Sequence, residues 1–519
     1  MWDSKSIQNS LRRFRTRCTA TRCIIVLGIA IPAIYGLSIL FGSPPAICIS
    51  ESTTRLSDPL SRDGRYIDYA EAMRRRYQIP EMVELKDDPW YILTFPERRL
   101  DIPLSFRPPA YTDPWFALSG RYSEDTLRQR LNRRLDVPFC QADDPELVEI
   151  ITNNSLWYDA FSATKPVWPA IDFTQTHSDG TARIEGIGDA LGELHLEINR
   201  RFAILAMLQL GDGRQGAAMA SAQTMLVVAN RDQYSLRRSI GLMESANDII
   251  WTALLSSPDI GESDILNILT IPVDTQLAST IIDRWNVFVR YELLDLLQEE
   301  HRTRCRDSRL VWTGLARSHL KERLFWRQVD WNSAMKSYNE LIDAYIETLQ
   351  NQSYRERSIS LANIFNSHSA FYEQDAVNID SFRKLLTEDM TALLVSQSSY
   401  LYSYAKSSSE LMCRDLNDRR RTHLVARLAA FKKASGHFPE TLASLLDIQG
   451  LPDAPENVTI DAFSDKPLKY ERTGDGFLIR SVGPDMEEDT ILASDRTKVM
   501  FDDIIWQWPL LKQKRQVFF

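Results

Sequence analysis

Residues 183–210 read RIEGIGDALGELHLEINRRFAILAMLQL, and this stretch has the clearest periodicity in the chain. Its apolar side chains recur every three or four residues, the spacing that places them on one face of an α-helix. They are Ile187, Leu191, Leu194, Ile198, Phe202, Leu205 and Leu208. Gly211-Asp212-Gly213 follows as a turn, and the Ala-rich segment 214–230 predicts a second helix. The two helices would form an αα-hairpin, the unit that helical repeat proteins stack.

Helical periodicity extends on both sides of this hairpin, from about 121 to 436. Further helices are predicted at 233–256, 262–269, 274–303, 308–350 (broken) and 378–404. No repeat of fixed period is present, so the domain is repeat-like without being a regular solenoid. Glycine accounts for only 20 of 519 residues, which disfavours an α/β enzyme built on glycine-rich phosphate loops. We therefore expect a mainly α, multi-helical domain.

The C-terminal part changes character. An amphipathic helix is predicted from 418 to 435, ended by Gly436, and a short helix follows from Pro439. Two strands are predicted at 468–472 and 477–481, joined by the turn sequence TGDG. We expect a small α+β domain over 418–519, with the only sheet of the chain lying within about 457–483.

The N-terminal part has the pattern of a membrane anchor. Residues 1–22 carry six basic side chains and one acid, and residues 23–42, CIIVLGIAIPAIYGLSILFG, carry no charge. Twenty helical residues span about 30 Å, the hydrocarbon thickness of a bilayer, and the basic flank orients the N-terminus to the cytoplasm. A cleaved signal peptide is the alternative, although its apolar core is usually shorter. We expect a single-pass inner (cytoplasmic) membrane protein whose bulk is extracytoplasmic.

Between anchor and helical domain, seven prolines fall in residues 80–114, interleaved with aromatic side chains. They predict an extended coil that packs against the main domain, after a stalk with one short helix near Tyr69. The expected divisions are a cytoplasmic tail 1–22, a transmembrane helix 23–42, a stalk and packed coil 43–120, a helical domain 121–417 and an α+β domain 418–519.

Four cysteines, Cys48, Cys140, Cys305 and Cys413, would lie in a compartment that permits disulfides. Three pairings are open, and four free thiols are the alternative.

The net charge of −9 argues against nucleic-acid binding. Tryptophans at 285, 312, 326 and 331 have helical spacing and are predicted to lie in the core.

Residues 424–503 resemble the C-terminal part of the type II secretion major pseudopilins. The similarity rests on GHFP at 436–439, DAFSDKPLKY at 461–470, GDGF at 474–477 and SVGPD at 481–485. In that family the following loop binds calcium. The chain lacks the prepilin features of the family, because no Gly precedes Cys23 and no acid lies within 23–42. The usual loop glycines are replaced by Met486-Glu487-Glu488-Asp489.

The loop 483–503 holds seven acidic residues against Arg496 and Lys498. Calcium takes six to eight oxygen ligands, and binding would relieve the repulsion between these carboxylates. The candidate ligands are Asp485, Asp489, Asp495, Asp502 and Asp503. A solvated acidic loop is the alternative.

The whole chain is similar to uncharacterised, membrane-anchored helical proteins of planctomycete-type bacteria that end in a pseudopilin-like domain. The similarity rests on DYAEA at 68–72, LWYDA at 156–160, VDWN at 329–332 and DDIIW at 502–506. It implies an architecture and no chemistry.

Catalytic signatures are not evident in the sequence: there is no HExxH, GxSxG or phosphate-binding GK[ST]. The interpretation favoured by these observations is a non-catalytic envelope protein, an interaction or scaffolding component connected with secretion. The alternatives are an extracytoplasmic hydrolase with a carboxylate site in the helical domain, and a small-ligand sensor. Two or more convergent carboxylates in a deep pocket would favour the hydrolase.

Overall fold

The computed structural model describes a subset of the chain: residues 46–78, 138–153, 171–172, 185–186, 201–231, 236–256, 261–270, 276–307, 330–351, 353–373, 398–487 and 504–508. The predicted membrane segment 23–42 lies outside these residues. Among the helices that are described, none is both long and apolar enough to cross a membrane. The described part is mostly helical, with a small three-stranded antiparallel sheet.

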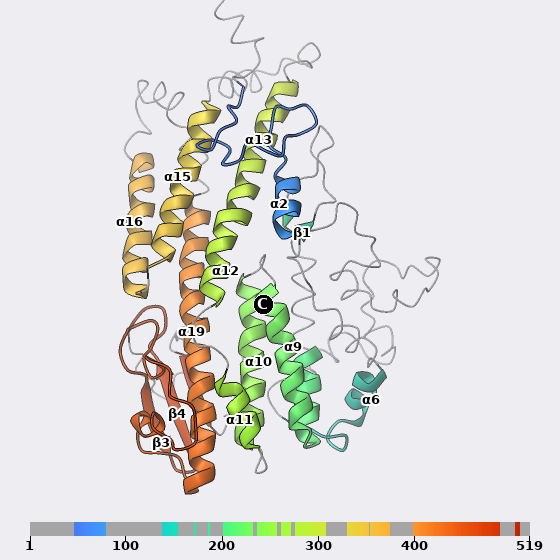
Figure 1. Cartoon of the computed structure of the whole chain (residues 1–519), viewed down its shortest axis with the longest axis vertical. Helices are drawn as coiled ribbons and strands as arrows, with labels where there is room; N and C mark the ends of the chain where they lie inside the picture. The colour runs from blue at the N-terminus through green and yellow to red at the C-terminus, as the bar shows by residue number, and fades with distance from the viewer. Residues whose placement is uncertain are drawn as a thin grey trace, which may run out of the picture.

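The axis of the fold is α19, a helix of 38 residues from Ser398 to Ser435 and about 57 Å long at 1.5 Å per residue. Two helices pack along its N-terminal half and two others along its C-terminal half (Figure 1). The first pair is α15 (Trp331–Leu349) and α16 (Tyr354–Glu373), and the second is α10 (Leu236–Ser256) and α11 (Glu262–Leu269). The sheet lies beside the C-terminal half of α19, at the end of the molecule away from the start of α15 (Figure 1).

A long helix runs beside α15 in three parts: α12 (Gln276–Arg284), a π-helical turn η3 (Trp285–Val289) and α13 (Arg290–Asp307). The π-helical turn positions Trp285, whose side chain is fully buried. Its Nε1 donates to Ser408 Oγ on α19 at 3.1 Å, and its ring contacts the rings of Tyr345 and Tyr404. Trp285 and Trp331 are thus core residues, as predicted, and Trp312 and Trp326 lie outside the described residues.

The predicted αα-hairpin is present from residue 201 onward. Residues 201–211 are helical, Gly213 takes a left-handed φ of 74°, and α9 (Gln215–Arg231) packs along α10. The predicted start at 183 is wrong, because β2 (Glu185–Gly186) pairs with β1 (Ile171–Asp172). Glycines at 186 and 188 lower the helix propensity there. This two-residue pairing also contradicts the expectation that all sheet lies within 457–483.

The C-terminal sheet has the order β3–β4–β5, from β3 (Lys469–Thr473), β4 (Gly476–Ser481) and β5 (Ile504–Trp508). The predicted hairpin is confirmed, with Gly474 in the left-handed region of its turn. The predicted limits of the sheet are wrong at their C-terminal side, because β5 pairs with β4 and places Trp506 opposite Ile479. A short 3-10 helix, η5 (Leu442–Leu445), precedes the sheet. We call residues 436–487 and 504–508 the C-terminal module.

Two other helices differ from the prediction. Residues 398–435 form one helix, where separate helices were predicted at 378–404 and 418–435, so the expected division at 417/418 falls within α19. The polar stretch between the two predicted helices is helical because its buried side chains form hydrogen bonds with other elements. Ser408 accepts from Trp285, and Asn417 donates to Asp461. Helix α16 was not predicted, and its apolar residues have weak helical periodicity. The short helix α2 (Tyr69–Tyr77) lies where the sequence indicated, and α6 (Pro145–Asn153) lies within the region of helical periodicity.

The end of helix 201–211 supplies a stability test. A Cβ atom at Gly211 would overlap the backbone of Phe139, whose N–H donates to Met207 O at 3.3 Å. Gly211→Ala should therefore lower the free energy of unfolding by about 1–3 kcal/mol. Gly216→Ala is the matched control: it meets nothing within 4 Å and should leave stability equal or raise it by up to about 1 kcal/mol. Equal losses in denaturant titrations of both variants would contradict this packing.

Candidate functional site

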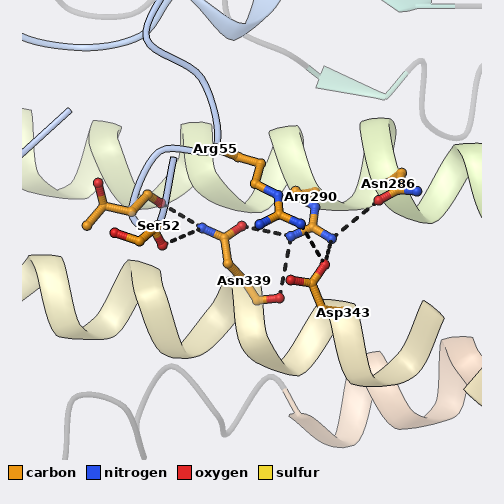
Figure 2. Close-up of polar contacts among 7 residues, drawn as sticks. Ser52, Arg55, Asn286, Arg290, Asn339 and Asp343 are labelled. Atoms are coloured by element: carbon orange, nitrogen blue, oxygen red, sulfur yellow. Dashed lines mark hydrogen bonds and ion pairs between the residues drawn. The ribbon is translucent and has the colours of Figure 1, made fainter. Parts of the chain in front are cut away.

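The segment that follows the predicted membrane helix is fastened to the bundle by a cluster of polar side chains (Figure 2). Three elements meet there: residues 52–55, the junction of η3 and α13, and the middle of α15. Asn339 and Asp343 are four residues apart and therefore share one face of α15. We call the cluster the N-terminal clasp; its members are Ser52, Thr53, Arg55, Asn286, Arg290, Asn339 and Asp343.

Asp343 joins the clasp's two guanidinium groups. Its Oδ1 accepts from Arg290 Nη2 at 2.5 Å and from Arg55 Nη2 at 3.1 Å. Arg290 Nη1 donates to Asn339 Oδ1 at 3.0 Å. The side-chain amide nitrogen of Asn339, Nδ2, in turn donates to the backbone carbonyl oxygens of Thr53 at 2.7 Å and Ser52 at 3.2 Å. One amide side chain thus links a buried arginine to the backbone of the incoming segment.

Burial differs sharply across the clasp. The Arg290 side chain is 1% exposed, whereas those of Asp343 and Arg55 are 43% and 37% exposed. Burial lowers the pKa of Arg290, and the hydrogen bond that its guanidinium donates to Asp343 opposes that shift. Arg55 has a left-handed φ of 63°, a conformation that costs a non-glycine residue about 1–2 kcal/mol. The ion pair with Asp343 is partly exposed and therefore offsets only part of this cost.

Contacts on both sides of the clasp continue the attachment. The Cys48 amide donates to Asn332 Oδ1 at 2.6 Å, at the first turn of α15. Tyr69 donates to Thr54 O at 2.6 Å, and the Ile67 amide donates to Gln298 Oε1 at 2.8 Å. Residues 46–69 are therefore held at several points along α13 and α15.

A second polar cluster, the C-terminal clasp, joins α19 to the C-terminal module. At its centre is Asp461, which opens the DAFSDKPLKY motif and is 2% exposed. Asn417 Nδ2 of α19 donates to Asp461 at 2.9 Å, and Asn417 Oδ1 accepts from the Ala462 amide at 2.8 Å. The other donors to the Asp461 carboxylate are Ser481 Oγ, Ser464 Oγ and the amides of Phe463 and Val482. Five hydrogen bonds compensate the burial of this carboxylate.

Of the predicted calcium ligands, the structure describes one. Asp485 is exposed, and its Oδ1 accepts from the Glu487 amide at 2.8 Å. Asp489, Asp495, Asp502 and Asp503 lie outside the described residues. Within the described part of the chain, no three His, Cys, Asp or Glu residues group in a way that could hold a metal. Calcium binding by the loop 483–503 stays a prediction.

Three of the four predicted extracytoplasmic cysteines are described, and each is a free thiol. Cys48 is exposed, Cys140 is partly exposed, and Cys413 is buried; the side chain of Cys305 lies outside the described residues. Cys413 Sγ lies 2.8 Å from Arg357 Nη2, and burial raises the pKa of its thiol to about 12. A buried thiol of this kind is chemically inert.

The chemistry available at the two clasps is that of attachment. Guanidinium groups keep their protons at physiological pH, so the N-terminal clasp cannot relay protons through its arginines. The carboxylates are used as acceptors that join separate segments, Asp343 for residues 52–55 and Asp461 for the module.

Sequence reasoning did not find the N-terminal clasp. Its signal was present in α15, where Asn339 lies on the buried stripe formed by Met335, Ile342 and Ile346. A polar residue on an apolar helical face indicates a buried hydrogen-bonding network. Which distant segment supplies the partners depends on tertiary contacts.

No family model matches the chain, and neither a curated protein nor a solved structure matches it.

Because of the N-terminal clasp, two substitutions on α15 should differ in their effect on the free energy of unfolding. Asp343→Ala removes the partner of a buried guanidinium and should lower the free energy of unfolding by about 1–3 kcal/mol, less than for a fully buried pair. Hydrogen exchange of amides 52–56 should rise at the same time. Lys336→Ala is the control, because its ion pair with Glu340 on α15 is exposed and contributes about 0.5 kcal/mol or less. Unchanged exchange at 52–56 in Asp343→Ala would show that the clasp does not hold the segment.

Thiol labelling tests the burial of Cys413. Maleimide at neutral pH should modify Cys48 in the folded protein and leave Cys413 unmodified, as read by peptide mass mapping. Both should react after unfolding in guanidinium. Fast labelling of Cys413 in the folded state would mean that the contact of α16 with α19 opens readily.

Proposed function

We propose that this protein is a non-catalytic, membrane-anchored scaffold of the cell envelope that holds its C-terminal module at a fixed place away from the membrane. The observation that supports this most directly is the N-terminal clasp. The sequence predicts a membrane helix at 23–42, and the clasp fastens residues 52–55 to the bundle only ten residues later. A flexible tether would need no such attachment.

The N-terminal segment meets α15 at one level of the bundle, and the module contacts the bundle at another. Residues 46–48 contact Asn332 at the start of α15, whereas the module contacts the start of α16, which follows the end of α15. There Ser353 Oγ donates to Asp465 Oδ2 at 3.1 Å, and the rings of Tyr354 and Phe463 lie 4.9 Å apart. The 19 residues of α15 separate the two levels by about 28 Å. Figure 1 shows the module at the end opposite the N-terminal segment.

The module is the part that we propose binds a partner. Its outer hairpin exposes Glu471, Thr473 and Asp475, and β3 is bonded to β4 on one side. The resemblance to the C-terminal part of the major pseudopilins supports an envelope partner connected with secretion. Anchored at one end and exposed at the other, the bundle would act as a spacer of fixed length.

Photo-crosslinking in native membranes tests this function. A photoreactive amino acid at Asp475 should give a discrete crosslinked product with one envelope protein, because this hairpin turn of the module is exposed. The same group at Glu340, exposed on α15, is the control and should give far less of that product. The full chain should resist carbonate extraction, and a chain lacking 23–42 should be released.

Two outcomes would contradict the proposal. A carbonate-soluble full chain would refute the anchor. Equal crosslinking from Asp475 and Glu340 would refute the module as the partner-binding part.

A further inference from the structure

A tight turn beside the N-terminal segment has the composition of a lipid-contacting surface. Residues 60–67 read LSRDGRYI, and Leu60 and Ile67 form an antiparallel bridge at its base. The Ser61 amide donates to Tyr66 O at 2.9 Å, and the Gly64 amide donates to Ser61 O at 2.8 Å. The turn is thus closed by its own backbone, and Gly64 supplies the positive φ of 68° that its tip requires.

The turn lies at the end of the bundle where the chain enters from the predicted membrane helix. Tyr66 OH lies 2.9 Å from His301 Nδ1, and the His301 ring packs against that of Trp331 at 5.3 Å. Asn332, the next residue, binds both Ala46 O and the Cys48 amide. A continuous series of contacts therefore connects the turn to residue 46.

The distance from this end to the membrane is limited by the chain itself. Ala46 lies four positions after Gly42, the last residue of the uncharged stretch, with three residues between them. A fully extended chain of that length spans about 14 Å. If residues 23–42 cross the bilayer, the N-terminal end of α15 and the turn beside it lie within reach of the lipid headgroups.

The exposed side chains of the turn suit an anionic membrane surface. Leu60 is 46% exposed, and Arg62 and Arg65 are both exposed. The one acid, Asp63, is engaged within the turn: its Oδ1 accepts from Ser61 Oγ at 2.7 Å and from the Arg65 amide at 3.1 Å. Neither arginine forms an ion pair within the described part of the chain, so both guanidinium groups are available to lipid phosphates.

Charge at the opposite end supports the same orientation. Residues 436–487 of the module carry ten acidic side chains against four basic ones, and Asp475 is exposed at the hairpin turn. An anionic surface repels that end and attracts the turn 60–67. On these grounds, and resting on the proposed membrane anchoring, we infer that residues 60–67 bind anionic lipid headgroups through Arg62 and Arg65, with Leu60 entering the interface.

Hydrogen exchange of the full chain in lipid nanodiscs tests the inference. The compositions are phosphatidylcholine alone and an equal mixture of phosphatidylcholine and phosphatidylglycerol. Exchange of amides 61–66 should be at least about fivefold slower in the mixture, because each of the two arginine–headgroup contacts contributes a factor of about five. The Arg62→Glu/Arg65→Glu double variant should lose this difference. Lys466→Glu, an exposed charge reversal on the module, should retain it.

Each outcome decides one of the two proposals. Equal exchange in both lipids, or slowing that persists in the Arg62→Glu/Arg65→Glu variant, overturns the lipid contact and leaves the anchor intact, because the chain is still recovered in nanodiscs. Failure of the chain to enter nanodiscs overturns the anchor itself. Both arginines are exposed, so the double variant should fold, and an unchanged thermal midpoint verifies this.

Discussion

The rest of the structure depends on α19, one continuous helix that packs against two different partners along its length. Its N-terminal half packs in a helical bundle, and its C-terminal half carries a sheet-containing module. Apolar burial alone would leave the register between these parts loosely defined. Buried polar side chains of α19 fix it, because each needs its own partner. Ser408 accepts from Trp285, Asn417 bonds Asp461, and the Arg421 guanidinium lies against the rings of Trp251 and Trp506.

The sequence predicts helices well where apolar spacing is strong. The helix at 262–269, the β3–β4 hairpin and the stop at Gly436 follow from local patterns, because each depends on neighbouring residues alone. Prediction failed where the deciding contact is distant. Residues 405–417 remain helical because of partners on other elements, and β5 forms only by pairing with β4. The clasps are of the same kind: Asn339 contacts a backbone more than 280 residues away in sequence.

The two clasps attach the N-terminal segment and the C-terminal module to one helical bundle. A buried arginine such as Arg290 is costly to desolvate, and its partners make this cost acceptable only in one arrangement. Such a network adds little stability but selects a single docking position for the incoming segment. The C-terminal clasp does the same for the module through Asp461. The scaffold role proposed above would require this kind of specificity at both ends.

The central claim is therefore that the N-terminal segment and the C-terminal module are parts of one rigid body. The most direct measurement is a spin–spin distance in the full-length protein, with labels carried by non-natural amino acids at Ser57 and Asp475, both exposed. We expect a single narrow distance distribution that broadens when Asp343 is replaced by Ala. A broad distribution in the unmodified protein would show that the two ends move independently and would contradict the account.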